Sequence, residues 1–447
     1  MFTVKAMIVL AVTVAFIEVW ISNYAESLFS RRGNYVVILS YVLLFITFSV
    51  LYGAFKIGIF RIHELIYSFS LAVVFTNAIM YLELSLIARE LVSVLPLVLG
   101  SVYQVAVVAV CSYCANVIYF KIHPVRHVLS IFNRDTSGFD LVLKMGRISE
   151  RFVIDAGLNA DDTDMDDIRH QIDKYDAVVI CGIDKNLQKQ IISYCYSHKK
   201  RTYLLPDITD IIINNSYNVQ MGDSPVLMSR NSGLTTEQLA VKRLLDIILS
   251  AAMLVLTLPI SIACAIAIKL DDGGPVFYKQ NRVTKDGKIF NIIKFRSMIV
   301  NAEAEGAQKA VNDDSRITKV GKVIRACRMD ELPQLLNILK GDMTFVGPRP
   351  ERIENVYEYS MLYPEFELRH RVKAGLTGFA QIYGKYNTTP QDKLHMDLIY
   401  AETYSMLLDI KLFILTFKIL FMKESTEGFT NEENNNAEKG TEKGNEN

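Results

Sequence analysis

The stretch IILSAAMLVLTLPISIACAIAI at residues 247–268 decides how this chain is organised. Its 22 uncharged residues would reach about 33 Å as a straight helix, which is enough to cross a bilayer. Pro259 lies near the middle and removes a helical hydrogen bond, so we expect a bend there. Thr257, just before the proline, could satisfy a carbonyl that the proline frees.

Basic residues flank this stretch on both sides. KRLLD at residues 242–246 precedes it and Lys269 follows it. A fifth span is the simplest interpretation, and it would place the parts before and after it on opposite faces of the membrane. The basic flanks and the central proline instead favour a re-entrant, broken helix within residues 236–269, which enters and leaves on the same face.

Four further apolar stretches fill the first 120 residues, at about 6–21, 35–55, 65–86 and 91–120. Because a membrane helix needs roughly 20 such residues, we predict four transmembrane helices within residues 1–122. Glu18 and Glu83 lie inside them, and an intramembrane carboxylate is a candidate functional group. Neither belongs to a repeated pattern, which favours packing within the bundle or a position near an interface.

Four spans place both ends of this region on one side of the membrane. The side predicted to be cytoplasmic holds more basic residues than the other, namely Lys5, Lys56, Arg61, Lys121 and Arg126 against Arg31, Arg32 and Arg89. This bias weakly supports cytoplasmic ends. The formal net charge of the chain is zero, so no global basic field favours a nucleic-acid partner.

Residues 123–235 change character and predict a Rossmann-like α/β domain. Apolar β-rich runs at 127–132, 152–156, 177–181 and 202–205 alternate with helical runs at 165–175 and 185–197. This alternation is typical of a small parallel sheet. A dinucleotide site would need a glycine-rich turn after the first strand, and the segment there contains only Gly138. A regulatory or scaffolding role is therefore favoured over nucleotide binding.

Residues 270–422 are polar and rich in motifs, and they predict a small mixed α/β catalytic domain. Runs at 276–283 and 288–296, joined around Asp286-Gly287, predict a β-hairpin. The hairpin carries four cations, which form either a solvated strand face or a set that faces phosphate: Lys279, Arg282, Lys294 and Arg296. The tail at 423–447 has few apolar residues and is expected to be disordered.

Two adjacent carboxylates, Asp330 and Glu331, lie in the segment RACRMDELPQ at residues 325–334. Neighbouring side chains on a helix point in different directions, which allows one to be a nucleophile and the other a metal ligand or acid–base group. Arg325 is within reach of Asp330 if the segment is helical or tightly turned. Arg349 lies between two prolines in FVGPRP at 345–350, where a fixed turn suits bidentate phosphate contact.

Taken in this order, the motifs resemble those of the bacterial sugar transferases, the monotopic polyprenyl-phosphate glycosylphosphotransferases. The matching segments are KRLLDIILS (242–250), GGPVFYKQNRV (273–283), KFRSM (294–298), DELPQLLNILKGDM (330–343), FVGPRP (345–350) and KAGLTGFAQIYGK (373–385), followed by Asp397, Tyr400 and Asp409. The preceding helices and α/β domain resemble the long subtype that starts exopolysaccharide or capsule repeat units.

The resemblance implies transfer of a sugar 1-phosphate from a UDP-sugar to undecaprenyl phosphate, with release of UMP. Asp330 would attack the β-phosphate and hold the sugar phosphate covalently. Glu331 would work with Mg²⁺, and both carboxylates are candidate metal ligands. The other site residues implied are Arg325 as a catalytic residue, and Lys294, Arg296, Arg349, Arg282, Lys279 and Gln334 for substrate binding.

The resemblance also implies a location. A helix broken at Pro259 would hold the active site at the cytoplasmic face of the inner membrane, where nucleotide sugars are made. The chain departs from the family pattern at three places, with Leu258 where serine precedes the proline, Ala374 where proline is frequent and Phe379 where tryptophan is frequent.

Several alternatives stay open at this point. One is a transporter or channel that uses Glu18 and Glu83, and another is a scaffold or regulator of a polysaccharide-assembly complex with an inactive transferase domain. The residues do not choose between sugars. The oligomeric state is open, and a homodimer is one possibility considered.

Overall fold

A computed structural model of the full chain describes residues 1–24, 32–133, 145, 151–229, 234–300, 302, 314–384 and 388–420. The chain divides into two compact units, Met1–Pro206 and Asp207–Asn447. The tail predicted to be disordered lies outside the described residues, as does most of the segment around Gly138.

Four long helices open the first unit. They are α1 (Phe2–Asn23), α3 (Gly33–Leu51), α4 (Ile62–Ala88) and α5 (Leu95–Ile122). They cover most of each predicted apolar stretch, but α3 ends before residues 52–55 and α5 begins after residues 91–94. Each is long and apolar enough to cross a membrane. The rings of Phe16 and Tyr41 stack 3.9 Å apart between α1 and α3. Glu83 accepts hydrogen bonds from the Ser40 hydroxyl at 3.0 and 2.9 Å, so this carboxylate does take part in packing within the bundle.

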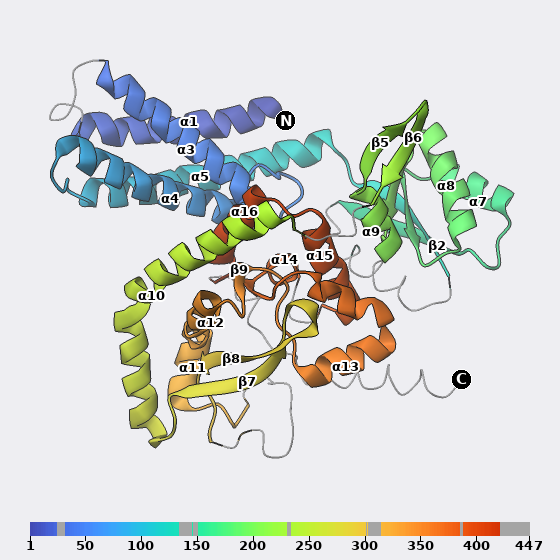
Figure 1. Cartoon of the computed structure of the whole chain (residues 1–447). Helices are drawn as coiled ribbons and strands as arrows, with labels where there is room; N and C mark the ends of the chain where they lie inside the picture. The colour runs from blue at the N-terminus through green and yellow to red at the C-terminus, as the bar shows by residue number, and fades with distance from the viewer. Residues whose placement is uncertain are drawn as a thin grey trace. The chain divides into compact units, whose positions relative to one another are not determined.

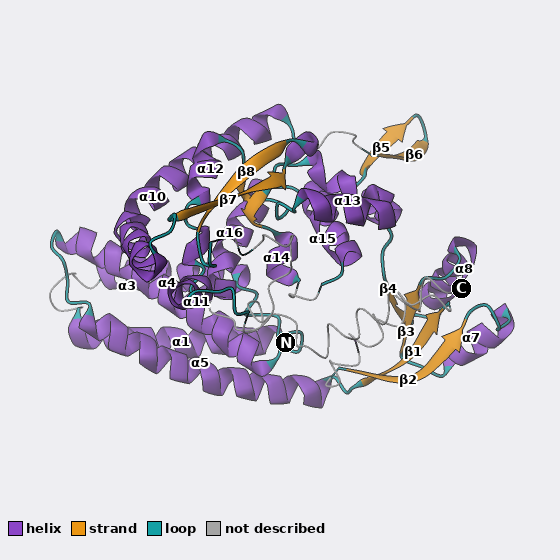
Figure 2. Cartoon of the chain, turned by 90° about the horizontal axis from the view of Figure 1, so that it is seen from below, coloured by secondary structure: helices purple, strands orange, loops and turns teal. Residues whose placement is uncertain are grey.

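A parallel sheet completes the first unit, as the alternation of strands and helices predicts. Its strands are β1 (Arg126–Phe132), β2 (Phe152–Asn159), β3 (Ala177–Cys181) and β4 (Arg201–Leu204), in the order β2-β1-β3-β4. Alternate residues of β1 and β3 face the helices α7 (Met165–Asp173) and α8 (Lys185–Ser197), where they form one apolar cluster. Figure 2 shows these strands side by side with both helices.

The second unit begins with a short helix. Helix α9 (Ile208–Asn214) buries Ile211 against Tyr359, Phe366 and Leu398 of the second unit, so it does not belong to the parallel-sheet domain predicted over residues 123–235. The antiparallel pair β5 (Tyr217–Met221) and β6 (Ser224–Met228) follows. Because α9 is short, its apolar residues do not show in the sequence which core will bury them.

Helix α10 (Thr236–Asp272) runs through Pro259 as one helix of 37 residues. Thr235 caps its start and Gly273, with φ of 70°, ends it. Figure 1 shows the helix changing direction along its length, as expected around a proline. The Thr257 hydroxyl donates to the Met253 carbonyl at 2.7 Å. It therefore does not bond the Val255 carbonyl, which lacks its usual helical donor because Pro259 has no N–H.

A small mixed domain follows α10. It begins with the hairpin β7 (Phe277–Val283) and β8 (Ile289–Phe295), whose turn is a 3₁₀ segment, η1 (Lys285–Gly287). Next come α11 (Lys319–Ala326), η2 (Met329–Glu331), α12 (Gln334–Lys340), β9 (Thr344–Val346), α13 (Ile353–Leu362), η3 (Pro364–Arg371), β10 (Gly375–Thr377), α14 (Phe379–Tyr383), α15 (Pro390–Glu402) and α16 (Met406–Leu420).

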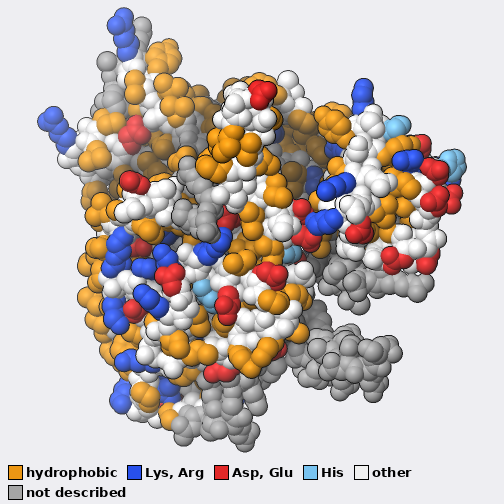
Figure 3. All heavy atoms as spheres, turned by 45° about the vertical axis from the view of Figure 1, so that its right-hand side comes forward, with side chains coloured by type: hydrophobic (Ala, Val, Ile, Leu, Met, Phe, Trp, Pro, Cys, Tyr) orange, Lys and Arg blue, Asp and Glu red, His pale blue; other side chains and the backbone are white. Residues whose placement is uncertain are grey.

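Residues of β8, α12, β9, α15 and α16 form the main core of this domain. Phe290, Leu335, Phe345 and Leu412 are among its buried members. Basic and acidic side chains gather on the face shown in Figure 3, while hydrophobic side chains also remain widely exposed there. Many of the exposed hydrophobic residues belong to the long apolar helices, including Val255 and Leu256 of α10.

Candidate active site

A single 3₁₀ turn presents the two carboxylates. Helix α11 ends at Ala326, and Arg328 adopts a left-handed conformation with φ of 53°. This reversal starts η2, which carries Asp330 and Glu331, and α12 begins almost directly after it. The two side chains therefore project from a short turn. The sequence allowed either a helix or a tight turn here, and the structure has the tight turn.

Two cations from separate segments hold Glu331. The Lys294 ammonium on β8 donates to Glu331 Oε1 at 3.1 Å, and the Arg349 guanidinium donates to the same oxygen at 2.7 Å. Burial opposes ionisation of this carboxyl, but Arg349 and Lys294 outweigh burial and lower the pKa of Glu331 below its usual range. Glu331 is thus a fixed anion between two cations.

Asp330 has a different environment. In the part of the chain that the structure describes, no hydrogen bond to its carboxylate is formed. Burial and the adjacent Glu331 raise the pKa of Asp330 above its usual value, although Lys294, Arg325 and Arg349 act in the opposite direction. A carboxylate that is more basic than usual and not engaged is suited to nucleophilic attack, and Arg325 contributes through its charge.

The four cations predicted on the β7–β8 hairpin do not all lie on the same face of it. Tyr278, directly opposite Lys294, shares a strand face with Arg282, since alternate residues of a strand point the same way. Lys279 points to the other face and is exposed. Arg282 donates to the Pro350 carbonyl at 3.0 Å and to the Gln280 amide oxygen at 2.7 Å. Lys294 and Arg282 therefore face the Arg349 loop, whereas the alternation of the strand carries Lys279 away from it.

Arg296 lies outside this cluster. It is 7% exposed, forms a two-pronged ion pair with the Asp272 carboxylate, and donates through Nε to the Pro275 carbonyl at 2.7 Å. These contacts fix the junction between α10 and the hairpin. Sequence reasoning grouped Arg296 with the phosphate-facing cations because the acidic turn at 271–275 gives no sign of which cation it will bind.

Gln334 starts α12 next to the catalytic turn. Its side chain is 2% exposed, and its amide nitrogen has no hydrogen-bond partner among the described residues. Its predicted role in substrate binding stays a prediction.

Glycine allows the Arg349 loop to lie close to a second strand. A Cβ atom on Gly347 would come within 2.3 Å of the Lys373 carbonyl, and one on Gly375 within 2.2 Å of the Gly347 nitrogen. The Gly347 N–H donates to Thr377, and the Gly375 N–H donates to the Pro348 carbonyl, both at 2.8 Å. The loop that carries Arg349 is therefore fixed at its backbone.

A buried ion pair that the sequence did not reveal supports the same loop. Arg369 donates to the Arg349 carbonyl at 3.0 Å and lies 2.7 Å from the Asp397 carboxylate. The Arg369 and Asp397 side chains are 2% and 1% exposed. Asp397 belongs to the motifs that carry the family resemblance, but it is far from Arg369 in sequence, so no spacing pattern indicates the pair.

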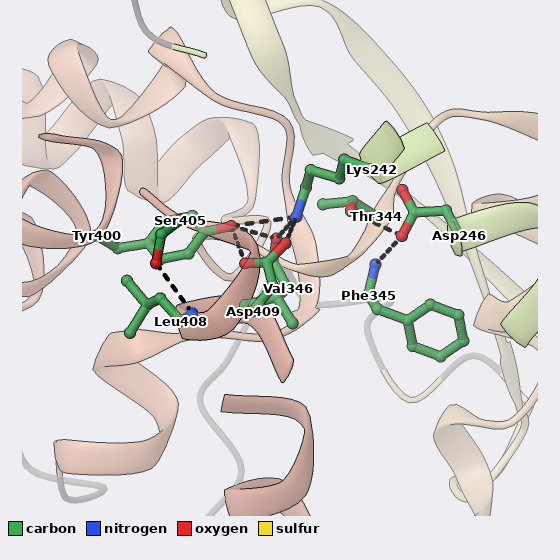
Figure 4. Close-up of polar contacts among 9 residues, drawn as sticks. All are labelled: Lys242, Asp246, Thr344, Phe345, Val346, Tyr400, Ser405, Leu408 and Asp409. Atoms are coloured by element: carbon green, nitrogen blue, oxygen red, sulfur yellow. Dashed lines mark hydrogen bonds and ion pairs between the residues drawn. The ribbon is translucent and has the colours of Figure 1, made fainter. Parts of the chain in front are cut away.

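The first third of α10 is attached to the domain by a second polar network, shown in Figure 4. The Lys242 ammonium forms an ion pair with Asp409 and donates to the Val346 carbonyl at 2.9 Å. The Tyr400 hydroxyl lies 2.8 Å from Asp409 Oδ1. One turn along the helix, Asp246 accepts from the Thr344 hydroxyl and the Phe345 N–H, both at 3.0 Å. The motif KRLLD is therefore structural at these positions.

The coupling between the two carboxyls gives a pH prediction. Glu331→Gln removes the neighbouring negative charge and leaves Lys294 and Arg349 to act on Asp330, so the pKa of Asp330 should fall. Asp330 would then ionise at lower pH, and the acid limb of the rate of the reaction in which Asp330 is the predicted nucleophile should shift downward. Single-turnover rates measured across pH check this, with Glu402→Gln as a carboxylate control outside the cluster. An acid limb that stays in place or moves upward would contradict the coupling.

Comparison with known proteins identifies the family of the chain. A family model described as bacterial sugar transferase matches residues 237–423. The chain is 34% identical over 304 residues to the UDP-glucose:undecaprenyl-phosphate glucose-1-phosphate transferase of Klebsiella pneumoniae, an alignment that covers 67% of this chain and 63% of that protein. This alignment is longer than the range of the family model, so it includes residues before α10.

Two further relatives match shorter parts of the chain. The UDP-N-acetylgalactosamine-undecaprenyl-phosphate N-acetylgalactosaminephosphotransferase of Aeromonas hydrophila is 42% identical over 183 residues, which are 40% of this chain and 43% of that protein. The UDP-glucose:undecaprenyl-phosphate glucose-1-phosphate transferase of Caulobacter vibrioides is 35% identical over 215 residues, covering 46% and 80% respectively. The chain spans 43% and 63% of the length of the Aeromonas and Klebsiella proteins. It spans 80% of the Caulobacter protein at 35% identity. The chain therefore belongs to the bacterial sugar transferase family.

Proposed function

We propose that this protein transfers a sugar 1-phosphate from a UDP-sugar to undecaprenyl phosphate and releases UMP, as the first membrane step of exopolysaccharide or capsule repeat-unit synthesis. The observation that carries the proposal is the difference in environment between the two adjacent carboxylates on η2. Glu331 is bound by Lys294 and Arg349, whereas Asp330 is half-buried beside them without a hydrogen bond to any described residue. The names of the relatives support the substrate class, because each includes undecaprenyl phosphate.

The proposed reaction has two steps. An Asp330 carboxylate oxygen attacks the β-phosphorus of the UDP-sugar, the bond from that phosphorus to the bridging oxygen breaks, and UMP leaves with the electron pair. An oxygen of undecaprenyl phosphate then attacks the same phosphorus and the bond to Asp330 breaks. The products are the free carboxylate and an undecaprenyl diphosphate sugar. Lys294 and Arg349 would bind phosphate oxygens during both steps, with Arg325 and Arg282 close to the same charge.

The two carboxylates fit a magnesium ion in the usual manner of phosphoryl-transfer sites. Mg²⁺ is bound by one or two carboxylates together with substrate phosphates, and Asp330 and Glu331 supply that number. Among the residues that the structure describes, no group of three or more His, Cys, Asp or Glu side chains forms a cage for a metal. When bound, Mg²⁺ would neutralise the diphosphate charge and stabilise the leaving group.

Removal of divalent metal should therefore lower the rate of UMP release. Metal bound to a phosphoryl oxygen contributes several kcal/mol, so chelation with EDTA is expected to reduce the rate by about 100-fold or more. Added Mg²⁺ in excess of EDTA should restore the rate, whereas added Na⁺ of equal ionic strength should not. An unchanged rate in EDTA would remove the metal from the proposal.

The contacts of α10 support a re-entrant path rather than a fifth span. Near its start, Arg243 donates to the carbonyls of Ile338 and Leu339 at 2.6 and 2.7 Å. Near its end, Cys264 and Ile268 pack with Phe295, Ile324 and other residues of the same domain. A spanning helix separates its ends by about 30 Å of hydrocarbon, and one domain on one side of the membrane could not contact both. We place this domain on the cytoplasmic face, where nucleotide sugars are made, with α1, α3, α4 and α5 crossing the membrane.

Labelling can test this topology. We expect single cysteines at exposed positions before and after α10, Asp161→Cys and Lys288→Cys, to react from the same cytoplasmic side. The background would carry Ser in place of the exposed Cys114 and Cys327. Both sites should react with an impermeant maleimide in inverted membrane vesicles and neither in spheroplasts. Reaction of the two positions from opposite sides would require α10 to span the membrane.

Membranes that contain the protein, undecaprenyl phosphate and a panel of UDP-sugars test the function directly. One UDP-sugar should release UMP and form a lipid-linked sugar diphosphate in equal amounts. Absence of UMP with every sugar, in membranes where polysaccharide assembly still requires the chain, would favour the scaffold alternative. The relatives' names include both glucose and N-acetylgalactosamine, so the panel of UDP-sugars must identify the sugar. The homodimer stays a prediction.

A further inference from the structure

A basic cavity of about 330 Å³ lies beside the start of α10, away from the carboxylate pair. Its wall contains residues of α10, the η1 turn of the hairpin and the segment before β10. Asp330, Glu331, Lys294 and Arg349 do not line it. Thr344, at the start of β9, does line it, whereas Arg349 follows the end of that strand. The cavity is therefore lined by residues separate from the carboxylate pair and its two cations.

Two of the five cations in the wall are already neutralised. Figure 4 shows Lys242 directed at Asp409 and Tyr400. Arg371 lies 3.3 Å from the Glu402 carboxylate. These two side chains hold the surrounding elements together.

The other three cations are Arg243, Lys285 and Lys373. Among the described residues, Arg243 donates to the carbonyls of Ile338 and Leu339 alone. These are neutral acceptors, so the contacts do not cancel its charge. In the described part of the chain, neither Lys285 nor Lys373 forms an ion pair. Burial, Arg243 and Lys285 lower the pKa of Lys373, while Asp246 and Asp342 act against that shift. The three cations therefore repel one another, and an anion between them would relieve the repulsion.

The two carboxylates in the wall do not supply that anion. Asp246 is 5% exposed, and one of its oxygens is occupied by Thr344 and Phe345. Asp286 is exposed at the tip of the hairpin turn and has a left-handed backbone with φ of 57°. Neither forms an ion pair with Lys285 or Lys373.

Apolar side chains border the cavity on the α10 side. Leu234 and Leu239 belong to its wall. On the following turns of the helix, Leu244 and Ile248 are 58% and 53% exposed, as expected for residues that contact hydrocarbon. A basic hollow next to an exposed apolar surface suits a ligand with a phosphate head and an acyl tail.

We propose that this cavity is a second phosphate site, in which Arg243, Lys285 and Lys373 bind the headgroup phosphate of an anionic membrane phospholipid. The proposal rests on the proposed position of α10 at the bilayer surface. It does not require transfer activity, so its failure would leave the proposed reaction untouched.

The reactivity of Lys373 provides a test. A lysine with a lowered pKa acetylates readily near neutral pH, and a bound phosphate would both raise that pKa and cover the amine. A rise of one pKa unit slows acetylation by about 10-fold. The full chain would be pulse-acetylated and digested for mass spectrometry in three preparations: phosphate-free detergent, the same detergent with inorganic phosphate, and nanodiscs that contain phosphatidylglycerol.

We expect Lys373 to react about 10-fold more slowly in phosphatidylglycerol than in detergent alone, with little protection from inorganic phosphate at the same phosphate concentration. Equal protection by inorganic phosphate would overturn the lipid assignment, and equal reactivity in all three preparations would overturn the site. Lys285→Gln should abolish the protection, and Lys288→Gln, three residues along the same turn and outside the cavity, should retain it. Protection that survives Lys285→Gln would show that the bilayer merely covers Lys373.

Discussion

Asp330→Asn is expected to lower UMP release by about 1,000-fold or more, because loss of a covalent nucleophile leaves only the contribution of binding and electrostatics. The substitution keeps the size and shape of the side chain, and Glu331 keeps its bonds to Lys294 and Arg349. The UDP-sugar should therefore still bind. The measurement is UMP released per enzyme in a single turnover, without the undecaprenyl phosphate acceptor.

A second readout separates the nucleophile from an acid–base role. With a UDP-sugar labelled in the β-phosphate, the unmodified protein should retain label on the peptide that contains Asp330, and Asp330→Asn should retain none. Glu402→Gln serves as the matched variant, since it removes a carboxylate outside the cluster and leaves Asp330 able to accept the label. UMP release that persists at the normal rate in Asp330→Asn would exclude the assigned nucleophile.

Asp397→Ala is expected to destabilise the second unit by about 3 kcal/mol, since it removes the nearer of the two carboxylates beside the buried Arg369 and leaves Glu351 at 3.8 Å. Both side chains are almost fully buried, and Arg369 also holds the carbonyl of Arg349. The midpoint of unfolding in detergent should fall. It can be measured from the protease resistance of the catalytic domain. Transfer activity should fall with it as the Arg349 loop loses its support.

The matched control is Glu402→Ala, which breaks the Arg371–Glu402 pair at 3.3 Å. That pair is more exposed, so its loss should cost less than about 1 kcal/mol. Replacement of both buried partners, Arg369→Met with Asp397→Leu, should recover part of the stability, because it removes the Arg369 and Asp397 charges together and costs only the contact of Arg369 with Glu351. Recovery of stability without recovery of activity would show that Arg369 positions Arg349. Equal effects of Asp397→Ala and Glu402→Ala would contradict the importance of the buried pair.

Local sequence patterns predicted most of the architecture. Periodicity and turn residues placed the apolar helices, the parallel sheet and the β7–β8 hairpin within a few residues, because each depends on neighbours in the sequence. The pairing of charges is a long-range property. The sequence could not show that Arg296 binds Asp272, that Lys279 faces away, or that Arg369 meets Asp397, since these depend on how separate elements pack.

The catalytic turn shows the same division. Two adjacent acids and nearby cations indicated a site, and their order indicated the family. Which carboxylate the cations bind was decided by the left-handed Arg328 and by the position of β8. That information is three-dimensional, and it separates a fixed Glu331 from an unengaged Asp330.

The close contact between the Arg349 loop and β10 has a consequence for the thermodynamics of substrate capture. Gly347 and Gly375 bring the two backbones together, and hydrogen bonds at 2.8 Å join them. The conformational entropy of this loop is therefore lost when the chain folds, and little of it remains to be lost when a diphosphate arrives. An arginine held in this way binds phosphate at one position in space. The fold itself then determines where the diphosphate lies, whatever sugar is attached to it.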